Sequence, residues 1–139
     1  CQAEGSIIVE VIATAGTEQT AHRAGDGYTY YEQDGSFHSA GTINLLVFTN
    51  CALTDGALTK ALITITEAKT VALQSLGIHS ILTDLPATGT STDGVIMTID
   101  PNGELLSDVG TFSQFGDTLA KAVRSAIEKA IENGNTLTL

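Results

Sequence analysis

The segment TDGALTKALITITEAKTVALQSLG, residues 54–77, constrains the fold of this chain more than any other part of the sequence. The hydroxyl of Thr54 can accept a hydrogen bond from a free amide in the first turn of a helix. Gly77 can adopt the left-handed conformation that ends a helix, and Ile78 can fold back as the closing hydrophobic contact. We therefore expect a helix from about Asp55 to Leu76.

Apolar side chains surround this helix on nearly all sides. One stripe at helical spacing consists of Leu58, Leu62, Ile65, Ala72 and Leu76. The opposite side is hardly more polar, since it carries Ile63, Val71 and several alanines. A helix of this kind is usually buried on several sides, so we expect it to pack in the interior.

Several other segments have the composition of strands. They are SIIVEVIATAG (6–16), TINLLVFTN (42–50), a short strand at His79–Thr83 and GVIMTID (94–100), with a short hairpin or ordered loop at 28–41. The segment 6–16 is apolar on both faces, which predicts a largely buried strand that pairs on both sides. The segment 42–50 carries Ile43, Leu45 and Val47 on one face and is mostly apolar on the other, which predicts a central strand.

A second helix is expected over Ser113–Asn133, ended by Gly134. Its inward residues have amphipathic spacing and are Phe115, Leu119, Ala122, Val123, Ile127, Ala130 and Ile131. The order is roughly β-β-β-α-β-β-α. This order predicts an α+β fold, with two helices packed on a mixed or antiparallel sheet and one domain over residues 1–139.

The composition excludes some classes of partner. The formal net charge is −10, and six lysine and arginine residues are too few to neutralise a run of phosphates, so we expect no nucleic-acid partner. No apolar run reaches the length of a membrane span. Two cysteines make no disulfide framework, which favours a reducing cytoplasm.

The histidines do not indicate a metal site, because His22, His38 and His79 lie in three separate segments without metal-ligand spacing. A surface or capping role is expected for each of them. Phosphate-loop and dinucleotide fingerprints are absent from the sequence, and we expect no cofactor.

The loop ATGTSTD, residues 87–93, is the most distinctive polar segment. It contains the hydroxyl donors Thr88, Thr90 and Thr92, together with Gly89 and the candidate base Asp93. This composition is typical of a ligand-binding rim. The same residues can also satisfy their own backbone in turns, and the residues alone leave both interpretations open.

Two charged residues of the first helix are candidates for chemistry. Lys69 falls on the apolar stripe, where we expect its stem to pack and its ammonium group to extend into water. Glu67 lies roughly 200° away around the helix, so the two cannot pair on one face. A carboxylate on so apolar a helix is either paired or usable as a general base.

Three ordered motifs resemble adenosylcobinamide amidohydrolase: GTINLLVFTN, the following LTDGALTKALITITEAKTVALQSLGI, and ATGTSTD. ATAG with AHRAGD resembles an upstream motif of the same family. The resemblance runs from about Ile8 to Ile99. It implies a hydrolase of corrinoid salvage in cobalamin biosynthesis. Such an enzyme cleaves the amide between the aminopropanol arm and the corrin ring, giving adenosylcobyric acid and aminopropanol.

Under this resemblance, amide hydrolysis needs a nucleophile, an oxyanion stabiliser and an acid for the leaving amine. We expect Glu67 or Asp93 to activate water, while Asn44, Thr90 and nearby backbone amides hold the oxyanion. Glu67, Asn44 and Asp93 are then expected near one cleft. The alternative is a threonine nucleophile, Thr88 or Thr90, assisted by Lys69.

Substrate-binding residues are expected in the polar segments that the family motifs share. These residues are Arg23, Asp26, Thr42, Thr88, Gly89, Thr90 and Thr92. The alternative function is a non-catalytic module that binds a corrinoid or another bulky cofactor with the same loop. Family members are generally longer, with a segment before this region. We therefore expect a second copy or such a segment to pack on the first strand, or an apolar patch to be exposed there.

Overall fold

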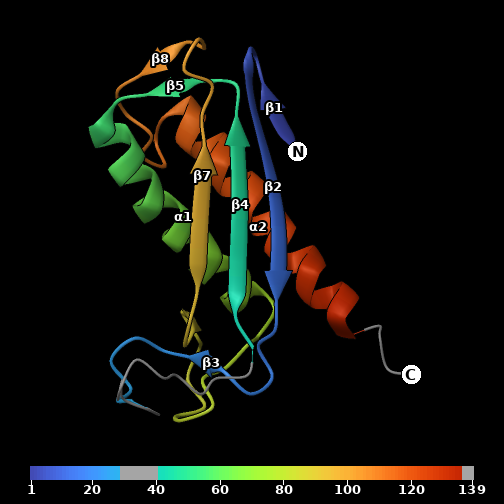
Figure 1. Ribbon diagram of the computed structural model, residues 1–139. Coiled ribbons are helices and arrows are strands. Elements are labelled where there is room, and N and C mark those ends of the chain that lie inside the picture. The colour runs from blue at the N-terminus through green and yellow to red at the C-terminus, as the bar shows by residue number, and fades with distance from the viewer. Residues whose placement is uncertain (29–40, 136–139) are drawn as a thin grey trace, which may run out of the picture.

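A computed structural model describes residues 1–28 and 41–135. Both helices lie on the same face of one main sheet (Figure 1). The elements are β1 Gln2–Glu4, β2 Ile7–Ala15, β3 Ala21–His22, β4 Ile43–Thr49, β5 Ala52–Leu53, α1 Asp55–Ser75, β6 Gly89–Thr90, β7 Gly94–Thr98, β8 Leu105–Leu106 and α2 Gln114–Asn135.

The main sheet has the order β1-β2-β4-β7. β2 pairs antiparallel with β1 and with β4, whereas β4 and β7 are parallel and are joined through α1. The expected α+β fold, with two helices on a mixed sheet, is confirmed. β4 lies between two partners, so its predicted central position is confirmed as well, and so is the pairing of β2 on both sides.

Two small sheets close the ends of the molecule. β5 pairs with β8 at one end, and β3 pairs with β6 at the other. In the second pair Ala21 lies opposite Thr90 and His22 opposite Gly89. This pairing joins the AHRAGD segment to the ATGTSTD loop.

The core lies between the main sheet and the helices. Ile43, Leu45 and Val47 on the inner face of β4 are at most 1% exposed, as their alternation predicts. α2 supplies Phe115, Leu119, Ala122, Val123, Ile127 and Ile131 to the same core. We call the other side of the sheet the outer face, because neither α1 nor α2 covers it (Figure 1).

The outer face corrects the prediction that the first strand is largely buried. Residues of β2 alternate, and Ile8 and Ile12 are 42% and 59% exposed. On the neighbouring strands Leu46, Phe48 and Ile96 are exposed too. Both helices pack on the inner face, so the apolar residues of the outer face have no layer of the described residues above them. The expected apolar patch at the first strand is therefore present.

α1 is also less buried than the sequence predicts. Its buried residues are Ala57, Ala61, Thr64, Ile65, Ala68, Ala72 and Leu73. Leu62, Ile63 and Val71 are 48%, 58% and 43% exposed, so the helix buries one face and not several. The predicted stripe is displaced toward the alanines, because small side chains allow the helix to approach the sheet and α2 closely.

The ends of α1 follow their local signals. The Thr54 hydroxyl accepts from the Ala57 amide at 3.2 Å, which confirms the expected N-cap. Gly77 has φ +65° and the Ile78 amide donates to the Leu73 carbonyl, as in a Schellman-type ending. α2 behaves differently at its end, since it continues through Gly134 to Asn135.

The strand expected at His79–Thr83 is absent. His79 makes a single bridge to Pro86, and the residues between them turn back on themselves. The Ser80 amide donates to the Leu85 carbonyl, and Asp84 adopts φ 56°. Ile81 and Leu82 are exposed because the turn holds them at the surface. The expected hairpin falls mostly on residues 29–40, outside the described residues. Within the described residues, neither helix is long and apolar enough to cross a membrane.

The N-cap of α1 makes a measurable contribution to stability. We expect Thr54→Ala to lower the free energy of unfolding by about 1 kcal/mol, because the Ala57 amide loses its acceptor. Thr59→Ala is the matched control, since that hydroxyl donates to the Asp55 carbonyl within the helix and alanine is the better helix former. Urea unfolding of both variants measures the difference, and an equal loss in the two would contradict the capping role.

Candidate functional site

A pocket of about 330 Å³ opens where α1 meets the small β3–β6 sheet. It lies at the end of the molecule where Figure 1 labels β3. The pocket is lined by His22, Ala24, Thr66, Lys69, Thr70, Thr88, Gly89, Thr90 and Asp93. We call it the Lys69 pocket. Its lining combines residues of the ATGTSTD loop, the AHRAGD segment and α1, three segments far apart in the sequence.

A partly buried ion pair joins α1 to the loop in this pocket. The Lys69 ammonium group contacts Asp93 Oδ2, and the two side chains are only 13% and 14% exposed. The prediction that the Lys69 ammonium group extends into water is therefore wrong, because Asp93 holds this group in the pocket. The carboxylate reaches the helix from the far end of the loop, and a nearby opposite charge makes partial burial of an ammonium group tolerable.

Asp93 receives three further hydrogen bonds besides the contact with Lys69. The Ile43 amide donates to Oδ1 at 3.2 Å, and the Thr90 amide donates to Oδ2 at 3.1 Å. The Thr90 hydroxyl also donates to Oδ1. A carboxylate offers about four acceptor positions, so all of them are occupied. In this arrangement Asp93 has no free acceptor position for a water molecule, whereas the Thr90 hydroxyl already donates to it.

Gly89 leaves the space that the ion pair occupies. A Cβ atom at this position would lie 2.5 Å from Asp93 Oδ2 and 2.8 Å from Lys69 Nζ. Both distances are shorter than a van der Waals contact. The close approach that glycine allows at this position is therefore to the ion pair of the chain itself.

Several threonines of the site hold the backbone. The Thr88 hydroxyl accepts from the Ala24 amide at 3.0 Å, and the Thr88 amide donates to the His22 carbonyl at 2.9 Å. The Thr42 hydroxyl donates to the Thr92 carbonyl at 2.7 Å. Thr88 and Thr42 thus bind the backbone of segments distant in sequence, and not that of their own turn. Thr90 is the loop threonine whose hydroxyl contacts a charged group of the pocket.

Arg23 and Asp26 lie in the turn after β3. Their side chains face each other at 3.6 Å, and the Thr83 hydroxyl donates to Asp26. Asp26 is 8% exposed and Arg23 43%. The lining of the Lys69 pocket includes their neighbours His22 and Ala24 but neither of them, so a role in substrate binding stays a prediction for both.

Two predicted catalytic residues lie away from the Lys69 pocket. Glu67 lines a separate hollow of about 310 Å³ between α1 and α2, together with Lys121 and Arg124. Asn44 is exposed on the outer face of β4, where its side chain lies against Gly94. The expectation that Glu67, Asn44 and Asp93 share one cleft is therefore wrong. Two residues correspond to roughly 200° around a helix. Because Lys69 faces the loop, Glu67 faces away from it, toward α2.

His22 is a titratable pocket residue that the sequence does not single out, and Ala24, Thr66 and Thr70 line the pocket without having been singled out either. We expect a surface or capping role for His22 because no other histidine lies at metal-ligand spacing. That spacing bears on metal binding and not on other roles of the imidazole. The β3–β6 pairing brings it to Gly89 and so to the pocket lining. Among the described residues no group of three or more histidine, cysteine, aspartate or glutamate side chains could hold a metal ion.

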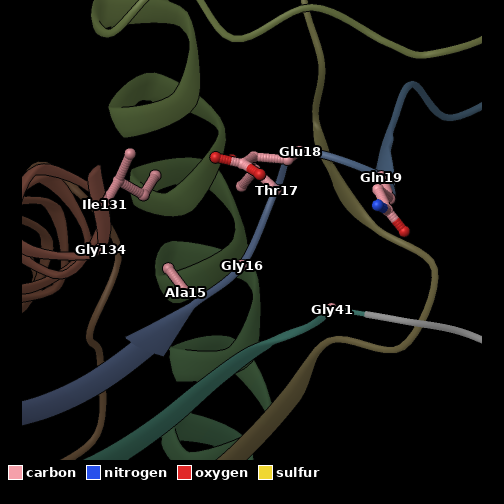
Figure 2. Close-up of a pocket in the computed structure, with 8 residues that line it drawn as sticks. All are labelled: Ala15, Gly16, Thr17, Glu18, Gln19, Gly41, Ile131 and Gly134. Carbon is pink, nitrogen blue, oxygen red and sulfur yellow. The ribbon is translucent and has the colours of Figure 1, made fainter. Parts of the chain in front are cut away.

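Another hollow of about 320 Å³ lies beyond the end of β2. Figure 2 shows its lining, which includes Glu18 and Gln19 in the loop after β2 and Ile131 near the end of α2. The side chains of Glu18 and Gln19 point in different directions in this view. Binding sites usually contain a few convergent polar groups, so the Lys69 pocket is the better candidate.

The fold and the Lys69 pocket describe an α+β protein with a partly buried lysine–carboxylate pair beside a threonine hydroxyl. Residues 1–139 match the family described as adenosylcobinamide amidohydrolase, and the chain belongs to this family. It is 38% identical over 136 residues to an uncharacterized protein of Methanocaldococcus jannaschii, covering 88% of this chain and 53% of that protein.

Two similar proteins carry the name adenosylcobinamide amidohydrolase. The one from Halobacterium salinarum is 30% identical over 125 residues, covering 90% of this chain and 51% of that protein. The one from Methanosarcina mazei is 31% identical over 102 residues, covering 67% and 48%. This chain thus spans about half the length of these relatives. No solved structure matches it significantly.

Gly89→Ala tests whether the ion pair requires a residue without a side chain at position 89. The added methyl group would force Asp93 and Lys69 apart, so we expect a loss of about 1–3 kcal/mol in the free energy of unfolding. Gly56→Ala in the first turn of α1 is the control, because a Cβ atom there meets nothing within 4 Å. If the two variants unfold at the same urea concentration, Gly89 does not support the pair.

Proposed function

We propose that the chain hydrolyses the amide that joins the aminopropanol arm of adenosylcobinamide to the corrin ring, and that it does so in the Lys69 pocket. The observation that carries the proposal is the ion pair of Lys69 and Asp93 with the Thr90 hydroxyl donating to the same carboxylate. The family name supplies the substrate. These three residues supply a nucleophile, a proton acceptor and a cation.

Thr90 is the nucleophile in this proposal. Its hydroxyl hydrogen bond to Asp93 fixes the direction in which the proton leaves. Thr90 Oγ1 attacks the amide carbon while its proton passes to Asp93, as a hydroxyl nucleophile requires an adjacent base. Asp93 has no free acceptor position for water at this stage, which is why the first step uses the hydroxyl and not a water molecule.

Lys69 provides positive charge and a proton. Its ammonium group contacts Asp93 with one hydrogen, and two hydrogens remain for the oxyanion and the leaving nitrogen. When the C–N bond breaks, Lys69 protonates the departing aminopropanol. The proton that Asp93 took from Thr90 then passes to the neutral Lys69 amine across their direct contact. This transfer restores the ion pair.

Water completes the reaction by hydrolysing the ester on Thr90. Once Thr90 Oγ1 carries the acyl group it no longer donates to Asp93, so one acceptor position on Oδ1 becomes free for a water molecule. Asp93 accepts the proton of this water as it attacks, and the proton then goes to Thr90 Oγ1 as the ester bond breaks. The carboxylic acid product is adenosylcobyric acid.

Substitutions in the pocket test this assignment by release of aminopropanol from adenosylcobinamide. We expect Thr90→Ala, Lys69→Met and Asp93→Asn each to lower kcat/KM by about 10²–10⁴-fold, the usual contribution of positioned acid–base groups. Thr90→Ser keeps a hydroxyl and should retain much of the activity.

Glu67→Gln is the matched carboxylate control for these variants. Glu67 lines the hollow between the helices, so we expect activity close to that of the unchanged protein. A large loss in Glu67→Gln with full activity in Thr90→Ala would contradict the proposed roles. Corrinoid binding without any release of aminopropanol would favour the non-catalytic module instead.

A further inference from the structure

The face of α1 beside the Lys69 pocket is exposed and apolar. Leu62 and Ile63 are 48% and 58% exposed, although leucine and isoleucine in a helix of this composition are expected in the core. Thr66 and Thr70 line the pocket, and they lie one and two turns further along the same side of the helix. We call Thr59, Leu62, Ile63, Thr66 and Thr70 the α1 strip.

The threonines of the α1 strip present little polarity to solvent. The hydroxyls of Thr59, Thr66 and Thr70 donate to the carbonyls four residues earlier, at 3.0, 2.7 and 2.9 Å. Because these polar atoms are used within the helix, the methyl groups extend the apolar surface of Leu62 and Ile63. The surface of the α1 strip is therefore more apolar than its three threonines suggest.

The strip also carries no charge, on a protein whose formal net charge is −10. Glu67, four residues after Ile63, borders the strip without belonging to it, and so does Lys60, three residues before Ile63. The Lys60 ammonium group is 2.9 Å from Asp108 and lies over the Phe112 ring. An uncharged apolar surface that runs into a polar pocket is unusual on so acidic a chain, and such surfaces commonly mark binding sites.

The proposed substrate is too large for the pocket alone. About 330 Å³ is near the lower limit for pockets that hold drug-sized ligands, and a corrinoid with its adenosyl group is considerably larger. The pocket can hold the aminopropanol arm and the scissile amide. The macrocycle must therefore contact the surface at the pocket mouth, which on the α1 side is the α1 strip.

We propose that the corrin ring lies on the α1 strip, over Leu62 and Ile63, while its aminopropanol arm enters the Lys69 pocket. This inference rests on the proposed function and names the surface that selects a corrinoid. The flat, methyl-bearing ring is complementary to an uncharged strip without projecting polar groups. The outer face of the sheet is a weaker candidate because α1, which carries Lys69, lies on the opposite side of the sheet (Figure 1).

The double variant Leu62→Asn with Ile63→Asn tests the inference. Both side chains are about half exposed, so polar replacements should leave the fold intact, and far-ultraviolet circular dichroism with urea unfolding checks this. We expect KM for adenosylcobinamide to rise about tenfold or more, because apolar contact with the ring is lost, while kcat changes little. The dissociation constant of adenosylcobyric acid, which retains the ring but not the arm, should rise by a similar factor.

Two control variants separate a specific effect from a general one. Val71→Asn changes another half-exposed residue of α1, outside the strip, and Ile96→Asn changes the outer face of the sheet. Both should leave KM and adenosylcobyric acid binding unchanged. An unchanged KM in the double variant, or an equal rise in the controls, would overturn the inference.

The proposed function and this inference fail in different ways. If the unchanged chain releases no aminopropanol and binds no adenosylcobyric acid, the proposed function is wrong. If it releases aminopropanol and the double variant does so with the same KM, the function stands and the α1 strip is not the ring surface. Inhibition by free aminopropanol, which lacks the ring, should be equal in the unchanged protein and the double variant.

Discussion

The ion pair between Lys69 and Asp93 is the interaction on which the rest of this end of the structure depends. The two charged groups of a pair this little exposed lose most of their hydration, and their mutual attraction alone seldom compensates for that cost. Asp93 compensates further through the Thr90 amide and hydroxyl and the Ile43 amide. One carboxylate thereby joins α1, β4 and the loop between β6 and β7. The lack of a side chain at Gly89 and the pairing of β3 with β6 are consistent with the need to leave room for it.

The one-sided covering of the sheet explains where the remaining apolar surface lies. Hydrophobic residues make up 42% of the sequence, but two helices on one face can bury only the inner residues of each strand. The apolar residues of the outer face, such as Ile12 and Ile96, therefore stay exposed, as does the side of α1 that faces away from the sheet. These two surfaces differ in one respect that matters for function. The exposed side of α1 is continuous with a polar pocket, and the outer face is separated from that pocket by the sheet itself.

The sequence predicted the features that depend on local chemistry. Thr54 and Gly77 mark the ends of α1 because a cap and a left-handed residue act within one turn, and the alternation of β4 identifies its inner face without knowledge of any partner. Features that depend on distant residues were not predictable in this way. The turn after His79 depends on a bridge to Pro86, and the position of the Lys69 ammonium group depends on a carboxylate 24 residues further along the chain. The exposure of Leu62 depends on which faces of α1 are covered by other elements, which periodicity does not reveal.

Helix geometry also decides which carboxylate can form an ion pair with Lys69. Glu67 is two residues before Lys69, roughly 200° around the helix, so no rotation of α1 can direct both side chains into one pocket. Once Lys69 faces the loop, Glu67 must face away from it, and in the structure it lies beside α2. The partner carboxylate must then come from outside the helix, and Asp93 is the one that the β6–β7 loop provides. Asp93 and Thr90 are three residues apart in one turn, so the residue that neutralises Lys69 also orients the hydroxyl. The same short loop thus fixes the charge balance of the pocket and the position of the Thr90 hydroxyl, the proposed nucleophile.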